Sequence, residues 1–287
     1  MPYSIGRLLP SRDDACAILE IEAACFGAST LSPAEALRTL SIPEHRLYAA
    51  RDPGSRRLIG FCSCFVLRDA RGSRLELDLL AVLPMARGKG LATRMLRLAL
   101  DEADSQGIPR ARGVVRTGNR PSERAFARAG LTAGTLSYEL LVYAPRGDHP
   151  VSYLPASWSD SLAGDRPPHL NNGNDTRPPE SFFTHSYVLD DARARLRTRA
   201  RVALVHTLSG SALWIERLQA SSTQCAATAA RGLVERAKQW GVDEVGLLAP
   251  DHRADRRMLP ALLAEGFERL GRFGVYERGG APSCISS

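Results

Sequence analysis

The sequence predicts an α/β protein in which helices cover a mixed sheet, and it predicts that two such units follow one another in tandem. Residues 1–145 alternate strand-like and helix-like hydrophobic patterns, which favours a mixed sheet covered by helices. Residues 186–287 return to this alternation after a stretch, 146–185, that has little periodic hydrophobicity. The length of 287 residues agrees, since one domain usually takes ~100–200 residues. We therefore expect two domains joined by a linker or a long loop.

The first elements follow from hydrophobic periodicity and from a helix cap. Residues 4–9 have the pattern of a short strand, and residues 13–26 have the apolar face of an amphipathic helix. Ser32 then marks the start of a second helix, because Pro33 fits the first turn and Glu35 can reach back to the cap.

Three strands are expected next, followed by a regular alternation. An Asp-Pro-Gly turn at 52–54 separates strand patterns at 46–51 and 58–67. A third strand at 75–83 ends at Pro84, since proline cannot donate to a sheet. The remaining elements are a helix at 91–105, a strand at 112–117, a helix at 122–129 and a strand at 137–143.

Composition excludes several classes of protein. Hydrophobic residues make up 44% of the chain and charged residues 24%, which excludes a wholly disordered chain. The longest apolar run, at 79–86, contains a proline and is far shorter than the ~20 residues of a membrane helix. Residues 1–10 lack the apolar centre of a signal peptide. We expect a cytoplasmic protein that does not bind membranes.

The charge and the cysteines bear on cofactors. The net charge of +7 fits a cofactor with several phosphates as well as it fits nucleic acid. The cysteines form no C-x-x-C pair and no histidine stands at zinc-site spacing, so we expect reduced thiols and no metal. The six cysteines are Cys16, Cys25, Cys62, Cys64, Cys225 and Cys284.

A glycine-rich turn joins the strand at 75–83 to the helix at 91–105. Gly88 and Gly90 let a phosphate approach backbone amides at a helix N-terminus, where the helix dipole adds about half a positive charge. Arg87 and Lys89 add formal charge. The spacing is neither G-x-x-x-x-G-K-[ST] nor G-x-G-x-x-G. We predict a pyrophosphate ligand; the alternative is a plain glycine turn with solvated charges.

Two spaced motifs resemble those of a known family. Residues 87–92, Arg-Gly-Lys-Gly-Leu-Ala, match the R/Q-x-x-G-x-G/A signature of the GNAT superfamily of acyl-CoA-dependent N-acyltransferases, and Val82 and Pro84 match the V-x-P that precedes it. Residues 119–122 with Phe126 resemble the family's second pattern, N-x-x-A/S-x-x-x-Y/F. The resemblance covers residues 1–145 and implies a fold, an acetyl-CoA cosubstrate and a set of site residues.

The resemblance implies a role for each motif position. Backbone amides of the turn would hold the coenzyme A pyrophosphate, and the strand edge just before it would pair with the pantetheine arm and polarise the acetyl carbonyl. The start of the helix at 122–129 would contact the pantetheine or the adenosine. The implied coenzyme-binding residues are Ala81, Val82, Arg87, Gly88, Lys89, Gly90, Leu91, Ala92, Asn119, Ser122 and Phe126.

The same resemblance leaves the general acid open. Phe126 stands where many members carry a tyrosine that protonates the departing thiolate. We expect Tyr138, Tyr143 or water to replace it.

The strand at 75–83 carries the candidates for the base. Residues two apart share a face of a strand, so Glu76 and Asp78 are expected on the face of Leu80 and Val82. Glu76 falls at the position of the glutamate base in the histone-acetylating branch of the family, and crowding of two carboxylates raises one pKa. We expect Glu76 as the base and Asp78 as an amine-binding partner; the alternative is that both are ordinary solvent-facing residues.

The C-terminal part resembles a degenerate copy of the same unit. Its expected elements are a strand at 213–218, a helix at 224–239, a strand at 244–248 and a helix at 259–264. Residues 222–225, Ser-Thr-Gln-Cys, replace the glycines and charges of the first copy. This half is expected to be a scaffold or an acceptor wall.

An alternating stretch of arginines precedes this copy. If it forms a strand, one face is all arginine; a solvated face that discourages aggregation and an anion site are the alternatives. No aromatic residues interleave, which disfavours nucleic acid as a partner. The arginines are Arg193, Arg195, Arg197, Arg199 and Arg201.

We therefore expect an acetyl-CoA-dependent N-acetyltransferase that acts by direct attack of an amine, without a covalent enzyme intermediate. The expected acceptor is a small-molecule amine, and an amine-bearing antibiotic is one candidate. The alternatives are acetylation of a cysteinyl sugar as in mycothiol synthases, acetylation of a protein or aminoacyl-tRNA amine, and a non-catalytic coenzyme A sensor. A homodimer is one expected assembly.

Overall fold

The chain folds as two compact units that interleave in sequence. The structure is a computed structural model and describes residues 3–27, 31–144, 158–160, 178–191, 196–250 and 258–279. Unit 1 comprises Met1–Thr135, His206–Gly210 and Phe273–Ser287, and unit 2 comprises Leu136–Val205 and Ser211–Arg272. Most of the expected linker at 146–185 lies outside the described residues, and the domain bounds at 145 and 186 stay a prediction.

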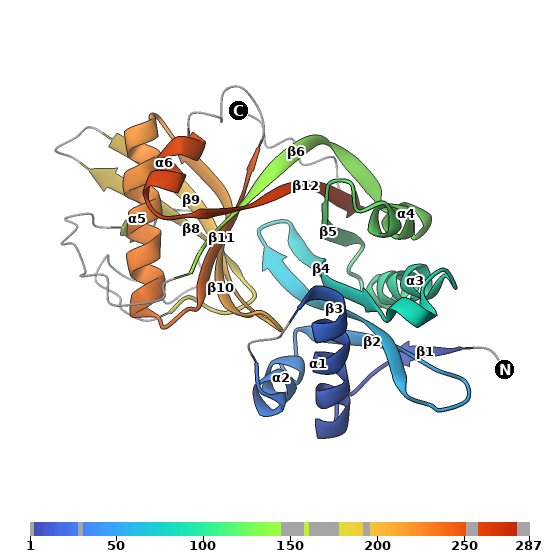
Figure 1. The fold of residues 1–287 in the computed structure, drawn as a ribbon. Coiled ribbons are helices and arrows are strands. Elements are labelled where there is room, and N and C mark those ends of the chain that lie inside the picture. The colour runs from blue at the N-terminus through green and yellow to red at the C-terminus, as the bar shows by residue number, and fades with distance from the viewer. Residues whose placement is uncertain are drawn as a thin grey trace. The chain divides into compact units, whose positions relative to one another are not determined.

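Unit 1 contains a mixed sheet, which confirms the expected fold class. Its strands follow the order β1-β2-β3-β4-β5-β12, in which only β4 and β5 pair in parallel among the pairings described. The last strand of the chain therefore lies beside β5 (Figure 1). The strands are β1 (Ser4–Arg7), β2 (His45–Arg51), β3 (Leu58–Asp69), β4 (Gly72–Val82), β5 (Arg110–Arg116) and β12 (Glu268–Arg278), of which β12 enters unit 1 at Phe273.

Helices pack on both faces of this sheet, because each has one apolar face. The core on one face joins α1 and α2 to the sheet, and the core on the other face joins α3 and α4 to it. The predicted cap at Ser32 is confirmed, since its hydroxyl accepts from the Glu35 amide at 3.3 Å. The helices are α1 (Arg12–Phe26), α2 (Pro33–Leu40), the 3-10 turn η1 (Pro84–Ala86), α3 (Leu91–Ser105) and α4 (Arg120–Arg128).

Strand β4 contains a bulge at Asp78. In the pairing of β3 with β4, Cys64 lies opposite Leu77 and Ser63 lies opposite Leu79, so Asp78 has no opposite residue. An extra residue in one strand inverts the alternation of side chains beyond it.

The bulge corrects the predicted face of the acidic pair. Leu77 packs in the core under α3 and α4, and so do Leu80 and Val82 beyond the bulge. Glu76 alternates with Leu77 and therefore points to the opposite face, toward α1 and α2. The prediction that Glu76 shares a face with Leu80 and Val82 is wrong, because strict alternation holds only for a regular strand.

Unit 2 contains a strand, a helix, a strand and a helix in the same succession as the second part of unit 1. Its strand order is β6-β11-β10-β9-β8-β7, and β10 pairs with β11 in parallel, as β4 does with β5. The elements are β6 (Thr132–Tyr143), β7 (Trp158–Asp160), β8 (Thr184–Asp191), β9 (Leu196–Thr207), β10 (Gly210–Ala220), α5 (Thr223–Gln239), β11 (Glu244–Pro250) and α6 (Met258–Ala264). Across both units, no helix in the described part of the chain is long and apolar enough to cross a membrane.

The alternating arginines lie partly in β9. Arg197, Arg199 and Arg201 belong to this strand, as expected, whereas Arg193 and Arg195 lie outside the described residues. Arg201 forms an ion pair of 3.3 Å with Glu216 of β10, and Arg199 is exposed. Within the described residues, the positive charge on this face of β9 is therefore partly neutralised.

Candidate active site

The site of unit 1 begins where β4 and β5 separate. The parallel pairing runs from Arg74 with Arg110 to Leu77 with Gly113, and no later pair of these strands occurs among the described residues. Beyond Gly113, β5 pairs with β12 instead. From the bulge onward, the edge of β4 that faces β5 thus has no strand partner among the described strands.

The backbone groups on this open edge belong to Leu80 and Val82. The Leu83 amide donates to Ile59 on β3 at 2.9 Å, and backbone groups two residues apart point to the same edge, so Ala81 also faces β3. Val82 therefore faces the open edge as the pantetheine expectation requires, whereas Ala81 does not. Leu80 was not among the predicted coenzyme-binding residues. A strand that alternates without a bulge gives no reason to choose it.

The glycine-rich turn leaves the N-terminus of α3 open. Gly88 and Gly90 have φ of +79° and +72°, and a Cβ built on either meets no atom within 4 Å. Arg94 is the first residue of this helix to bond back, to the Gly90 carbonyl at 3.1 Å. Within the described chain, the amides of residues 88–93 find no backbone acceptor, as is normal for a first helical turn. The turn therefore presents amides, open space and a helix dipole to an anion.

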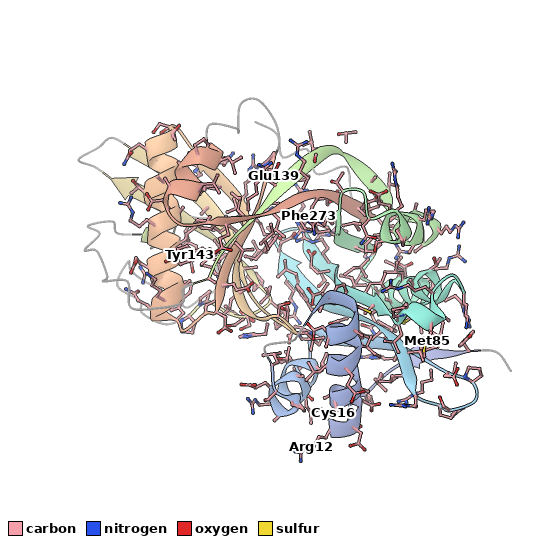
Figure 2. All side chains as sticks on the ribbon, in the orientation of Figure 1. Arg12, Cys16, Met85, Glu139, Tyr143 and Phe273 are labelled. Atoms are coloured by element: carbon pink, nitrogen blue, oxygen red, sulfur yellow. The ribbon has the colours of Figure 1, made fainter. Side chains whose placement is uncertain are left out.

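The two charged residues of the turn have different surroundings. Arg87 donates from Nε to the Val82 carbonyl at 3.0 Å, which ties the turn to the end of β4. Lys89 is exposed, and its Nζ lies 2.5 Å from the Tyr3 hydroxyl. Met85, in η1 just before the turn, is 79% exposed (Figure 2). The predicted turn residues from Arg87 to Ala92 are thus brought together, with Arg87 in a supporting position.

The second motif forms the start of α4 and part of the core. The Asn119 side chain accepts from the Ser122 amide at 3.4 Å, so it caps the helix. Phe126 is buried, and its ring lies where a side chain on Gly113 would stand. The expected replacements for its missing hydroxyl, Tyr138 and Tyr143, both belong to unit 2.

Glu76 is held by two arginines. Its carboxylate pairs with Arg74 through one oxygen and with Arg112 Nε through the other at 3.0 Å, and the residue is buried. Both oxygens already accept charge-assisted hydrogen bonds, so a proton taken from a substrate would compete with a guanidinium. This geometry fits an anchor between β4 and β5 better than a base.

Asp78 has the surroundings that a base requires. Its Oδ2 is buried and finds no hydrogen-bond partner in the described part of the chain. Burial, and then the negative charges of Glu22 on α1 and of Glu76, raise the pKa of Asp78 to about 7. A carboxyl with a pKa near neutral pH, at the point where the sheet opens, is suited to accept a proton.

The matching helix of unit 2 is closed at its N-terminus. The Ser222 hydroxyl accepts from the Cys225 amide at 3.2 Å, so the helix supplies its own cap. The Cys225 sulfur is buried and lies 2.8 Å from the same hydroxyl. Residues 222–225 contain no glycine, and none of them has the positive φ found at Gly88 and Gly90.

Part of the chain matches a known protein family. Residues 16–131 match the sequence profile of the acetyltransferase (GNAT) family. A GCN5-related N-acetyltransferase from Sphaerobacter thermophilus has a similar fold, with a TM-score of 0.57 and 15% identity over 97% of this chain and 97% of that chain. No curated protein matches the sequence.

A second solved structure is similar over most of the chain. It is a fungal multi-domain GH3 β-N-acetylglucosaminidase with a GCN5-related glucosamine N-acetyltransferase region. The TM-score is 0.58 and the identity 14%, and the match covers 96% of this chain but 38% of the fungal one. At these identities both structures establish a shared fold.

Proposed function

Because residues 16–131 belong to the acetyltransferase (GNAT) family, we propose that this acetyltransferase transfers the acetyl group of acetyl-CoA to a primary amine of a small molecule. The observation that carries the proposal is the open N-terminus of α3 beside the open edge of β4. The first fits a pyrophosphate and the second fits the amide groups of a pantetheine arm. An amine-bearing antibiotic and an amino sugar are candidate acceptors.

Each part of the site has a task in this proposal. The amides that follow Arg87 hold the pyrophosphate, and the backbone of Leu80 and Val82 holds the pantetheine arm. Bound acetyl-CoA supplies an acetyl group activated as a thioester. Asp78 accepts the proton of the attacking ammonium, while Glu76 keeps β4 and β5 in register through its two arginines.

The proposal is tested by screening amines with acetyl-CoA and measuring the release of free thiol. The panel contains an aminoglycoside, glucosamine, a cysteinyl sugar and a peptide with a free α-amine. We expect thiol release and an acetylated product with at least one small-molecule amine. Tight coenzyme binding without turnover of any amine would instead identify a non-catalytic coenzyme sensor.

The open turn predicts that Gly90→Ala weakens the binding of acetyl-CoA by about tenfold or more, equivalent to ~1.4 kcal/mol. A methyl group there enters the space that the pyrophosphate would occupy. Isothermal titration calorimetry should find one tight site per chain in the unchanged protein, since the helix of unit 2 carries its own cap.

Gly107→Ala is the matched control for this substitution. Gly107 follows the other end of α3, has φ of +73° and also has open space around a built Cβ. Both variants should lose roughly 1 kcal/mol of stability, but only Gly90→Ala should lose affinity. Equal affinity in the two variants, or two comparable sites per chain, would contradict the assignment of the turn.

A further inference from the structure

The site described so far lacks a donor for the departing sulfur. Phe126 has no hydroxyl, and Tyr138 and Tyr143 lie in unit 2. The tyrosines in the sequence of unit 1 are Tyr3, Tyr48 and Tyr276.

Two of these three tyrosines are engaged elsewhere. Tyr48 is buried, and its hydroxyl hydrogen bonds with Glu102. The Tyr3 hydroxyl lies beside Lys89 at the glycine-rich turn. Tyr276 remains, and its ring contacts Phe126 edge to face, with centroids 5.5 Å apart and an interplanar angle of 65°.

The register places Tyr276 at the point where the sheet opens. In the pairing of β12 with β5, Tyr276 lies opposite Gly113. Gly113 is also the last residue of β5 that pairs with β4, where it lies opposite Leu77. Asp78 follows directly in β4. One row across three strands therefore carries Tyr276, Gly113 and Leu77, next to the candidate base.

Small residues leave room for the two aromatic rings. Phe126 occupies the side-chain space of Gly113, and a Cβ on Gly274 would lie 3.6 Å from Cε2 of Tyr276. Both rings pack against the core under α3 and α4, on the face opposite to that of Glu76. Glu76 and the Tyr276 ring thus lie on opposite faces of the sheet, close to the row where β4 and β5 separate.

The phenol of Tyr276 is available as a donor. The ring is partly exposed, and the hydroxyl makes no hydrogen bond within the described residues. Partial burial and the charge of Glu123 raise the pKa of Tyr276, against the opposing effect of Arg120. The hydroxyl therefore carries its proton at neutral pH.

We propose that Tyr276 is the catalytic acid of the acetyl transfer, an inference that rests on the function proposed above. The amine nitrogen forms a bond to the acetyl carbon while the carbon–sulfur bond breaks, and the electron pair leaves with the sulfur. The Tyr276 hydroxyl gives its proton to that sulfur, which yields the free thiol of coenzyme A. The second proton of the acylated nitrogen passes through water to the phenolate, which restores the Tyr276 hydroxyl. The last strand of the chain thereby supplies a reacting group to a site built from its first half.

Rates in four variants test this assignment. Tyr276→Phe should lower thiol release by about 10–100-fold, with the KM for acetyl-CoA within about twofold. Adding Phe126→Tyr to it returns a hydroxyl to the neighbouring ring and should recover at least about tenfold. Tyr187→Phe, in β8 of unit 2, is the control and should leave the rate unchanged. A loss in Tyr138→Phe with full activity in Tyr276→Phe overturns the proposal.

Calorimetry gives a readout that does not depend on turnover. We compare the binding of coenzyme A with that of desulfo-coenzyme A, which lacks the sulfur. Tyr276→Phe should reduce the preference for the thiol by about threefold, the effect of one hydrogen bond, and leave desulfo-coenzyme A binding unchanged. An unchanged preference overturns the proposal whether or not any amine is acetylated. If Tyr276→Phe reduces the preference for the thiol but the protein acetylates no amine, only the proposed function is rejected.

Discussion

Asp78→Asn is expected to lower the rate of acetyl transfer by about 10²–10⁴-fold at neutral pH, since the amide keeps the shape of the side chain but accepts no proton. Acetyl-CoA binding should change little, because the glycine-rich turn lies beyond the far end of β4. Initial rates of thiol release, together with calorimetric binding, measure the two effects. An unchanged rate would remove Asp78 from the mechanism.

The same substitution is expected to stabilise the protein at alkaline pH. The pKa of Asp78 rises from 3.8 to about 7 on folding, so the folded state holds this proton more tightly than the unfolded state. The stability that this proton confers is present below pH 4 and is lost as the pH rises through about 7; it amounts to roughly 4 kcal/mol at most. Asp78→Asn has no carboxyl to ionise at this position, so it does not lose this stability as the pH rises. Its melting temperature should exceed that of the unchanged protein at pH 8, and the difference should shrink toward pH 4.

Glu76→Gln is expected to have the opposite pattern, with a large loss of stability and a smaller loss of rate. Removing one partner of a buried ion pair costs about 3–5 kcal/mol, and here the amide would leave Arg74 and Arg112 without a carboxylate partner at Glu76. Urea unfolding measures this cost. The rate per folded molecule should fall by less than it does in Asp78→Asn.

Glu235→Gln is the control for that measurement. Glu235 pairs with Lys238 three residues along α5, at 3.2 Å, and such pairs contribute less than about 1 kcal/mol. If Glu76→Gln instead kept its stability and lost as much rate as Asp78→Asn, the base would be Glu76.

Structural features that depend on a few neighbouring residues could be predicted from the sequence. The cap at Ser32 and the glycine-rich turn at Gly88 and Gly90 depend on neighbours in the chain, so these elements could be predicted closely. The role of Glu76 could not be predicted, because the register of β4 against β5 decides which arginines pair with it. Arg112 lies on β5, and no residue near Glu76 in the sequence indicates that the two side chains pair.

The sequence by itself therefore determined the mixed α/β fold and the glycine-rich turn before α3, because both rest on local periodicity, caps and glycines. Only the tertiary structure showed that Asp78 stands in a bulge and that Tyr276 packs against Phe126. The bulge at Asp78 exists only in the pairing of β4 with β3, and Tyr276 reaches Phe126 only because β12 pairs with β5. Pairing between distant strands depends on how both strands bury their side chains, and a single segment of sequence does not contain that information.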